Sequence, residues 1–214
     1  YQDDGKPIDQ LISGHVKYLF PKEHAEIYYE YGWNDGSSNL RDLTLENAHA
    51  AASVFGIRKL TYINNSSYIS FQAEATKMAQ SPGYLQRNAS DWYIHGLITD
   101  GYTNENQILG AGSGLGNNLQ TIIMSWNKGW NKYGIKFQHI IHNPIDKDGV
   151  SNVLIREGEI PNWIDYSYGI VLKHKYKNIL FNLNIDWVNS KNYLWQDKNN
   201  ASNFYFFFNT IYLW

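Results

Sequence analysis

Five carboxylates fall on the polar positions of segments in which polar and apolar residues alternate. Pairs of carboxylates carry out glycoside hydrolysis, but that reaction needs two of them at a defined separation, which one sequence does not give. Carboxylates spread over several strands can instead form ion pairs with cations on the same face. We therefore expect a charge network that braces the polar face of the fold. Its expected members are Glu26, Glu30, Arg58, Glu74, His95, Lys136, Asp165 and Asp186.

The histidine spacing argues against a metal site. His139 and His142 lie three residues apart in "HIIH", so on a helix they could share an ion, whereas on a strand they point to opposite faces. His95 has no serine or aspartate at a spacing that assigns it a partner, and we expect a hydrogen-bonded structural histidine. The chain has no cysteine, which excludes thiolate ligands and disulfides. The sequence therefore predicts no metal site and gives no reason to expect a cofactor.

The stretch "LGAGSGLGNN" has four alternating glycines but does not match a catalytic or nucleotide-binding motif. The pattern G-x-G-x-x-G fails at Leu115, and no helix is expected after it. The pattern G-x-S-x-G fails because Ala111 and Leu115 flank Ser113 where glycines are needed. In a strand, the four glycines would share one face and let a backbone, a loop or a sugar ring approach closely. We favour a glycine-rich bend or close packing inside the fold.

Alternation of polar and apolar residues is the dominant pattern along the chain, and it predicts β-strands. We count about ten such segments, separated by turn residues in connections that are both short and long. Four of the clearest are "EIYYEYGWN", "SYISFQAEAT", "IDYSYGIVL" and "NILFNLNIDWVN". The only helical candidate is Leu43–Ile57, which has room for one short turn of helix before a strand pattern resumes. The pattern predicts one all-β antiparallel meander over residues 1–214.

A soluble sandwich and a transmembrane barrel both alternate, and the aromatic residues favour the barrel. Aromatic residues make up 16% of the chain, and no apolar run is long enough for a spanning helix. The last segment, "FYFFFNTIYLW", places Phe204, Phe206, Phe208, Tyr212 and Trp214 on one face, interrupted by Thr210. Tryptophans expected near the ends of apolar faces, where they suit a water–lipid boundary, are Trp33, Trp126, Trp163 and Trp187.

The terminal segment is similar to the last strand of Gram-negative outer-membrane barrels, which the barrel-assembly machinery reads. We therefore expect an outer-membrane location, with lipid and the assembly machinery as partners. The formal net charge of −2, with scattered lysines and arginines, gives no reason to expect nucleic acid. The first residues, "YQDDGKPIDQ", lack the basic and then apolar pattern of a signal peptide.

Three blocks of sequence, Glu26–Asp35, Ala48–Leu60 and Trp92–Gln120, resemble the Wzi capsule-assembly family. Their order and spacing match the family, while the terminal strands match it only in barrel character. The residues that carry the resemblance are Glu30, Tyr31, Gly32, Asn34, Asp35, His49, Gly56, Lys59, Trp92, Tyr93, His95, Gly101, Tyr102, Thr103, Gln107, Leu109, Gly110, Gly116 and Asn118.

The resemblance implies an outer-membrane β-barrel that acts as a surface lectin. Such a protein holds capsular polysaccharide at the cell surface, helps to organise the capsule and is not an enzyme. Family members are about twice as long, with roughly eighteen strands and a small helical element near the N-terminus. The chain therefore looks like the C-terminal part of a larger barrel.

Sugar binding requires aromatic faces together with amides and carboxylates, and the expected loops and strand ends supply both. An open channel or porin for small solutes is the alternative function, and a hydrolase is disfavoured because no catalytic constellation is visible. The candidate polysaccharide-binding residues are Trp33, Asn34, Asp35, Tyr102, Asn104, Asn106, Asn117, Asn118, Trp130 and Asn131.

Overall fold

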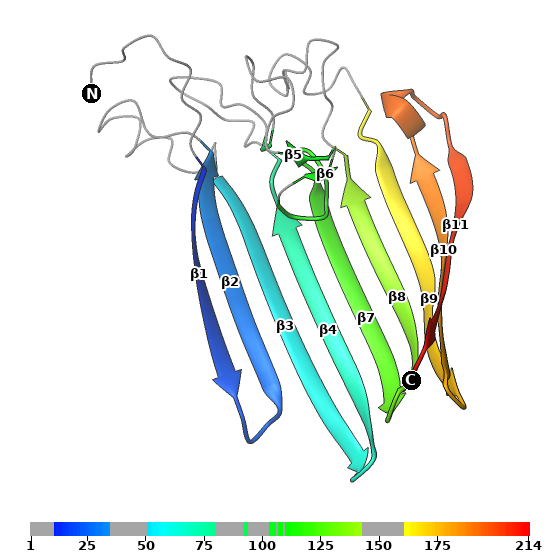
Figure 1. Ribbon diagram of the computed structural model, residues 1–214. Helices are drawn as coiled ribbons and strands as arrows, with labels where there is room; N and C mark the ends of the chain where they lie inside the picture. Colours follow the sequence, from blue (N-terminus) through cyan, green and yellow to red (C-terminus); the bar gives the residue numbers. More distant parts are fainter. Residues whose placement is uncertain are drawn as a thin grey trace.

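The computed structural model describes residues 11–34, 51–79, 92–93, 103–105, 107–108, 110–142 and 161–214. Nine strands form one sheet in the order β1-β2-β3-β4-β7-β8-β9-β10-β11, and β5 pairs with β6 (Figure 1). The sheet strands are β1 (Leu11–Phe20), β2 (Ala25–Asn34), β3 (Ala51–Asn64), β4 (Ser67–Lys77), β7 (Asn118–Lys128), β8 (Asn131–Ile141), β9 (Ile164–Tyr176), β10 (Ile179–Lys191) and β11 (Ala201–Tyr212). The remaining elements are β5 (Thr103–Asn104), β6 (Gln107–Ile108) and a 3₁₀ turn, η1 (Tyr193–Trp195).

Short and long connections alternate along the sheet, and each kind occupies one edge. The short turns span residues 21–24, 65–66, 129–130 and 177–178 and define the short-turn edge. The connections over 35–50, 78–117, 142–163 and 192–200 define the long-connection edge. The chain ends at the short-turn edge, because the Leu213 N–H donates to the Asn178 carbonyl at 2.7 Å (Figure 1).

All neighbouring strands are antiparallel, so the register extends the alternation of each strand across the whole sheet. The five acidic residues of the nine strands all fall on one face, which we call the polar face. They are Glu26, Glu30, Glu74, Asp165 and Asp186. The opposite face, which we call the apolar face, contains no aspartate or glutamate within these strands.

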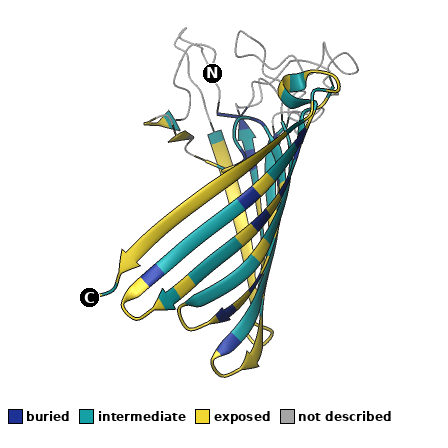
Figure 2. Ribbon diagram, turned by 90° about the vertical axis from the view of Figure 1, so that its right-hand side faces the viewer, coloured by how far each residue is buried: buried dark blue, intermediate teal, exposed yellow. Residues whose placement is uncertain are grey.

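Burial across this sheet is the reverse of that in a water-soluble sandwich. Polar-face side chains such as Ser125 and Asp186 are 3% and 7% exposed. On the apolar face, Ile135 and Phe206 are 65% and 64% exposed, and Figure 2 shows exposed positions recurring along the strands. The polar side chains lie on the face where strands two apart come into contact, as the Lys136–Asp186 ion pair shows at 2.8 Å. The sheet therefore packs its polar side chains together and leaves its apolar side chains uncovered.

The structure confirms the predicted all-β antiparallel meander, with nine strands in the main sheet against about ten expected. Within the described residues β1 pairs only with β2, and β11 pairs only with β10. The sheet is therefore open, with β1 and β11 as its outermost strands. The closed barrel stays a prediction. No helix within the described ranges has the length and apolar character needed to cross a bilayer.

Three local expectations need correction or limits. Trp163 precedes β9 and shares the side of Asp165, to which its indole donates a hydrogen bond at 2.7 Å, so it does not belong to the apolar face. Within the helical candidate Leu43–Ile57, residues from Ala51 onward are strand β3, and the earlier ones lie outside the described residues. In β11 aromatic residues occupy both faces, because Tyr205 and Phe207 are also exposed opposite the predicted row.

Candidate functional site

A recess of about 550 Å³ lies on the polar face near the long-connection edge. Strands β2, β3, β4, β7 and β8 form its floor, and Tyr93 and residues 110–113 of the β4–β7 connection cover it. The polar side chains of the floor are Glu30, Gln72, Glu74, Thr76, Thr121 and Gln138. A volume of this size is typical of small-ligand sites, which span roughly 300–1,000 Å³.

Register explains why the floor is continuous. Glu74, Thr121 and Gln138 are successive partners across β4, β7 and β8 and therefore stand side by side. The Gln138 amide donates to the Thr121 hydroxyl at 3.1 Å, which fixes the orientation of both side chains. The row thus presents a carboxylate, a hydroxyl and an amide in one line.

A missing side chain in β3 lets β2 reach this row. The hydroxyl of Tyr28 donates to the Glu74 carboxylate across the intervening strand. A Cβ on Gly56 would lie 2.0 Å from the Cζ atom of Tyr28, so only glycine leaves room for the ring to cross. Gly56 therefore sets the position of Glu74 through the ring that lies over it.

The loop over the recess is held by aromatic packing. Met78, Trp92 and Tyr93 form a small buried cluster. The Ala111 N–H donates to the Tyr93 hydroxyl at 3.0 Å, and a Cβ on Gly110 would lie 2.3 Å from that ring. The Tyr93 ring thus packs against bare backbone and joins two segments of the loop.

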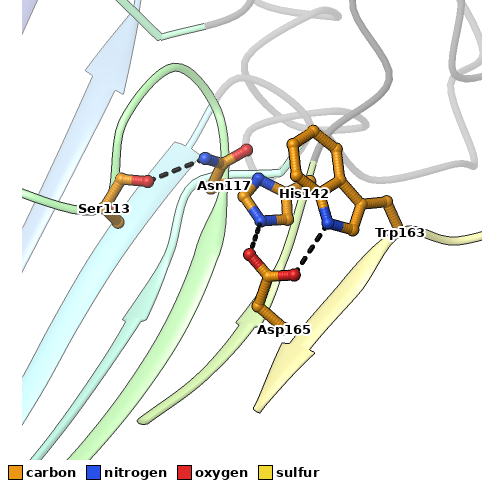
Figure 3. A network of polar contacts seen from close by, with 5 residues as sticks. All are labelled: Ser113, Asn117, His142, Trp163 and Asp165. Carbon is orange, nitrogen blue, oxygen red and sulfur yellow. Dashed lines mark hydrogen bonds and ion pairs between the residues drawn. The ribbon is translucent and has the colours of Figure 1, made fainter. Parts of the chain in front are cut away.

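Residues Gly110–Asn117 form the arch of this roof, and they are bends and turns, not a strand. Gly114 and Gly116 adopt φ values of +90° and +62°, which favour glycine. The Asn117 amide donates to the Ser113 carbonyl at 2.7 Å and closes the arch (Figure 3). This outcome agrees with the expectation of a glycine-rich bend.

Asn118 joins the arch to the sheet. Its side-chain oxygen accepts hydrogen bonds from the N–H groups of Met78 and Ala79, both at 3.0 Å. These two donors belong to the chain just after β4, and Asn118 begins β7. The amide therefore connects the two ends of the long connection between neighbouring strands.

The lining defines the chemistry that the recess favours. Two carboxylates line it, and no lysine, arginine or histidine is among its described lining residues. Its other polar groups are amides and hydroxyls, which both donate and accept hydrogen bonds. The recess therefore suits a neutral, hydroxyl-rich group or a cation better than an anion.

A second cluster lies beside β8 and β9 at the long-connection edge. Asp165 accepts hydrogen bonds from the His142 ring and the Trp163 indole, both at 2.7 Å (Figure 3). The His142 and Trp163 rings stack at 3.8 Å between centroids, and Tyr193 and Trp195 each contact Trp163 edge-on at 5.0 Å. The carboxylate is satisfied within the cluster, so the arrangement fixes the loop ends and presents aromatic rings beside them.

The structure places every described member of the expected charge network on the polar face. Glu26 lies between Arg58 at 2.9 Å and Lys17 at 3.5 Å, while Lys136 pairs with Asp186 at 2.8 Å. Asp165 pairs instead with His142, and His95 lies outside the described residues. The predicted network therefore consists of separate groups of two or three residues, and Glu30 and Glu74 face the recess.

The sugar-binding candidates do not form one surface. Trp33 and Asn34 are neighbours on β2 and point to opposite faces. Asn117 and Asn118 hold the arch, and Asn104 is exposed in β5. Trp130 and Asn131 lie at the short-turn edge, away from the others. The candidates Asp35, Tyr102 and Asn106 lie outside the described residues.

Several residues of the recess and of the aromatic cluster around Asp165 were not among the candidates predicted from the sequence. Gln72, Thr121 and Gln138 carried only the signal of a polar position in a strand, and Tyr93 only that of the family block. His142 and Asp165 come together because β8 pairs with β9 in the observed register. His139 lies on the other face and bonds Gln120 at 2.8 Å, so the two histidines do not converge, as expected.

Comparison of the chain with protein-family models, with curated proteins and with solved structures finds no match. The Wzi resemblance therefore stays a prediction from the sequence. Within the described ranges, no group of three or more histidine and acidic residues could hold a metal ion.

Proposed function

We propose that this chain is the wall of an outer-membrane β-barrel that binds capsular polysaccharide at the cell surface. The observation that carries the proposal is the reversed burial in the sheet, whose apolar side chains are exposed and whose polar side chains are packed together. The long-connection edge would face outward and the short-turn edge the periplasm, as in bacterial barrels.

The exposed residues of the apolar face support a lipid contact. Val16, Phe55, Ile122, Ile135 and Phe206 come from five strands and are 45–65% exposed. Soluble monomers rarely expose a continuous apolar area of more than a few hundred Å². In lipid the same side chains need no protein cover, and the ladders between neighbouring strands pair their backbone groups with a single irregularity, at Tyr62–Asn64 among the described residues.

The recess and the aromatic cluster support sugar binding. Both lie at the long-connection edge, where an extracellular polymer would arrive. The floor offers amides and hydroxyls for sugar hydroxyls, and the Tyr93 ring lies over it. Trp163, Tyr193 and Trp195 add aromatic faces at the same edge.

A glycan-binding assay tests the proposal. The purified protein should retain capsular polymer on beads, and replacing Gln72 and Gln138 together with alanine should reduce retention roughly fivefold to tenfold, as expected when about two hydrogen bonds are lost. The matched control replaces Asn203 and Asn209, two amides on the polar side of β11 that do not line the recess. Equal loss in both variants, or no retention by the unaltered protein, would contradict the sugar site.

Conductance in a planar bilayer separates the lectin from the channel. The arch lies across the polar face, so we expect low conductance that added polymer leaves unchanged. Large, steady conductance would favour the alternative, a porin for small solutes. Failure of the protein to enter the bilayer would contradict the membrane location itself.

A further inference from the structure

A second hollow, which we call the turn-edge groove, runs along the short-turn edge and has a volume of about 820 Å³. It extends from Ser66 in the β3–β4 turn, past Trp130 in the β7–β8 turn, to Lys177 in the β9–β10 turn. Neither the sugar site nor the charge network uses it.

Lysines dominate the charge around the groove. Lys128, Lys175 and Lys177 line it, and no aspartate or glutamate is among its described lining residues. Lys173 and Lys175 place their ammonium groups 5.7 Å and 5.5 Å from the centre of the same Trp130 ring. The hairpins 124–137 and 170–183 contain no acidic residue and six lysines, of which only Lys136 pairs with a described carboxylate, that of Asp186; the six are Lys128, Lys132, Lys136, Lys173, Lys175 and Lys177.

One wall of the groove is continuous with the apolar face. Trp126 and Tyr133 line it and stack on each other with centroids 5.7 Å apart. Next to them on the same face stand Met124 and Ile135, which are 46% and 65% exposed. The groove therefore brings ammonium groups next to a surface suited to hydrocarbon, and Lys128 shares the face of Trp126 and Tyr133.

A ligand that matches both the lysines and the apolar wall carries a phosphate next to an acyl chain. We propose that the turn-edge groove binds the headgroup of an anionic phospholipid in the leaflet at the short-turn edge. Its phosphate would lie among Lys128, Lys175 and Lys177, and its chains would run over Trp126 and Tyr133 onto the apolar face. An acidic protein segment would satisfy the lysines but would leave the aromatic wall without a partner of its kind. The proposal rests on the proposed contact of the apolar face with a bilayer.

Lipid retention tests the groove. The protein is reconstituted in nanodiscs of phosphatidylglycerol and phosphatidylcholine in equal parts and extracted, and the lipids that remain bound are counted by native mass spectrometry. We expect phosphatidylglycerol to be enriched over phosphatidylcholine by roughly tenfold, the effect of neighbouring lysines at a charged surface. This comparison uses the unaltered protein, so it needs no variant to fold.

A matched pair of triple variants locates the effect. Lys128→Gln, Lys175→Gln and Lys177→Gln together should abolish the enrichment. The control, Lys77→Gln, Lys191→Gln and Lys198→Gln, removes the same charge near the long-connection edge and should keep it. The proposal for the groove is overturned by equal retention of the two lipids, or by an equal loss of enrichment in both triple variants. It is also overturned if millimolar polyglutamate displaces the bound lipid and detergent does not.

The outcomes also separate this proposal from the proposed function. If the protein inserts but retains both lipids equally, the groove is wrong and the membrane location is unaffected. If the protein does not insert into the nanodisc at all, the membrane location is wrong and the groove proposal fails with it.

Discussion

Two crossings on the polar face use the same device with different chemistry. In one, Tyr28 of β2 passes over Gly56 of β3 to reach Glu74 of β4. In the other, Lys136 of β8 passes over Gly169 of β9 to reach Asp186 of β10. The first pair is a neutral donor with one carboxylate, and the second is an ion pair whose side chains are 18% and 9% exposed.

The difference between the crossings follows from where each lies. Glu74 lines the recess, so water can replace part of what Tyr28 supplies. Asp186 of β10 stands opposite Gly169 of β9, and one of its carboxylate oxygens is already buried without a hydrogen-bond partner among the described residues. Removing the partner of a buried charge is expected to cost more than removing a hydroxyl beside a wetter one. The crossing at Gly169 is thus the structural one, and the crossing at Gly56 positions a recess residue.

The largest effect is expected from breaking the ion pair. Lys136→Met should lower the free energy of unfolding by about 2–4 kcal/mol, because the Asp186 carboxylate loses its cation in a poorly hydrated place. Urea unfolding in detergent, followed by tryptophan fluorescence, measures the change. Adding Asp186→Asn should recover part of the loss, since the uncompensated charge is then gone. A double variant as unstable as the sum of the two single ones would show that the two residues do not interact.

The glycines are expected to come next. A Cβ at Gly169 would lie 2.1 Å from the Asp186 Oδ1 atom and 3.0 Å from the Lys136 Cε atom, and one at Gly56 would lie 2.0 Å from Tyr28, so each alanine must displace a side chain of its crossing. We expect a loss of roughly 1–3 kcal/mol for either substitution. Gly14→Ala in β1 is the control, because nothing lies within 4 Å of its added Cβ.

Removing the obstructed side chain sharpens this test. Gly56→Ala should be nearly harmless in a Tyr28→Ala background, and Gly169→Ala should be nearly harmless in an Asp186→Ala background. If the alanines remained as damaging there, strand backbone preferences would explain the glycines and the crossings would not.

Much of the sheet was predictable because alternation is a local property. The pattern around Glu26–Asn34 and Asn178–Asn189 predicted the face of each side chain, and the structure keeps all five acidic residues of the strands on one face. Trp163 was assigned to the wrong face because it lies one residue before β9. Its side chain points to the same side as that of Asp165, which is two residues later. Local patterns thus predict strands and faces well within an element and less well at its ends.

The crossings and the recess were not predictable because they depend on register between strands. Gly56 has a function only when Tyr28 and Glu74 stand opposite it on the two neighbours, and no spacing along the chain states this. The recess requires β4 to pair with β7 across the connection 78–117 and the arch to fold back over the sheet. Alternation does not specify which of many registers the strands adopt.

The smallest effect is expected at the Tyr28 hydroxyl. Tyr28→Phe removes the donor to Glu74 but keeps the ring over Gly56, so the loss of stability should be about 1 kcal/mol. Because the Glu74 side chain would then be free to rotate, we expect a clear loss of glycan retention beside this small loss of stability. Tyr29→Phe, on the apolar face of the same strand, is the matched control and should change neither. A Tyr28→Phe variant with normal retention and a large loss of stability would make this crossing structural, like the one at Gly169.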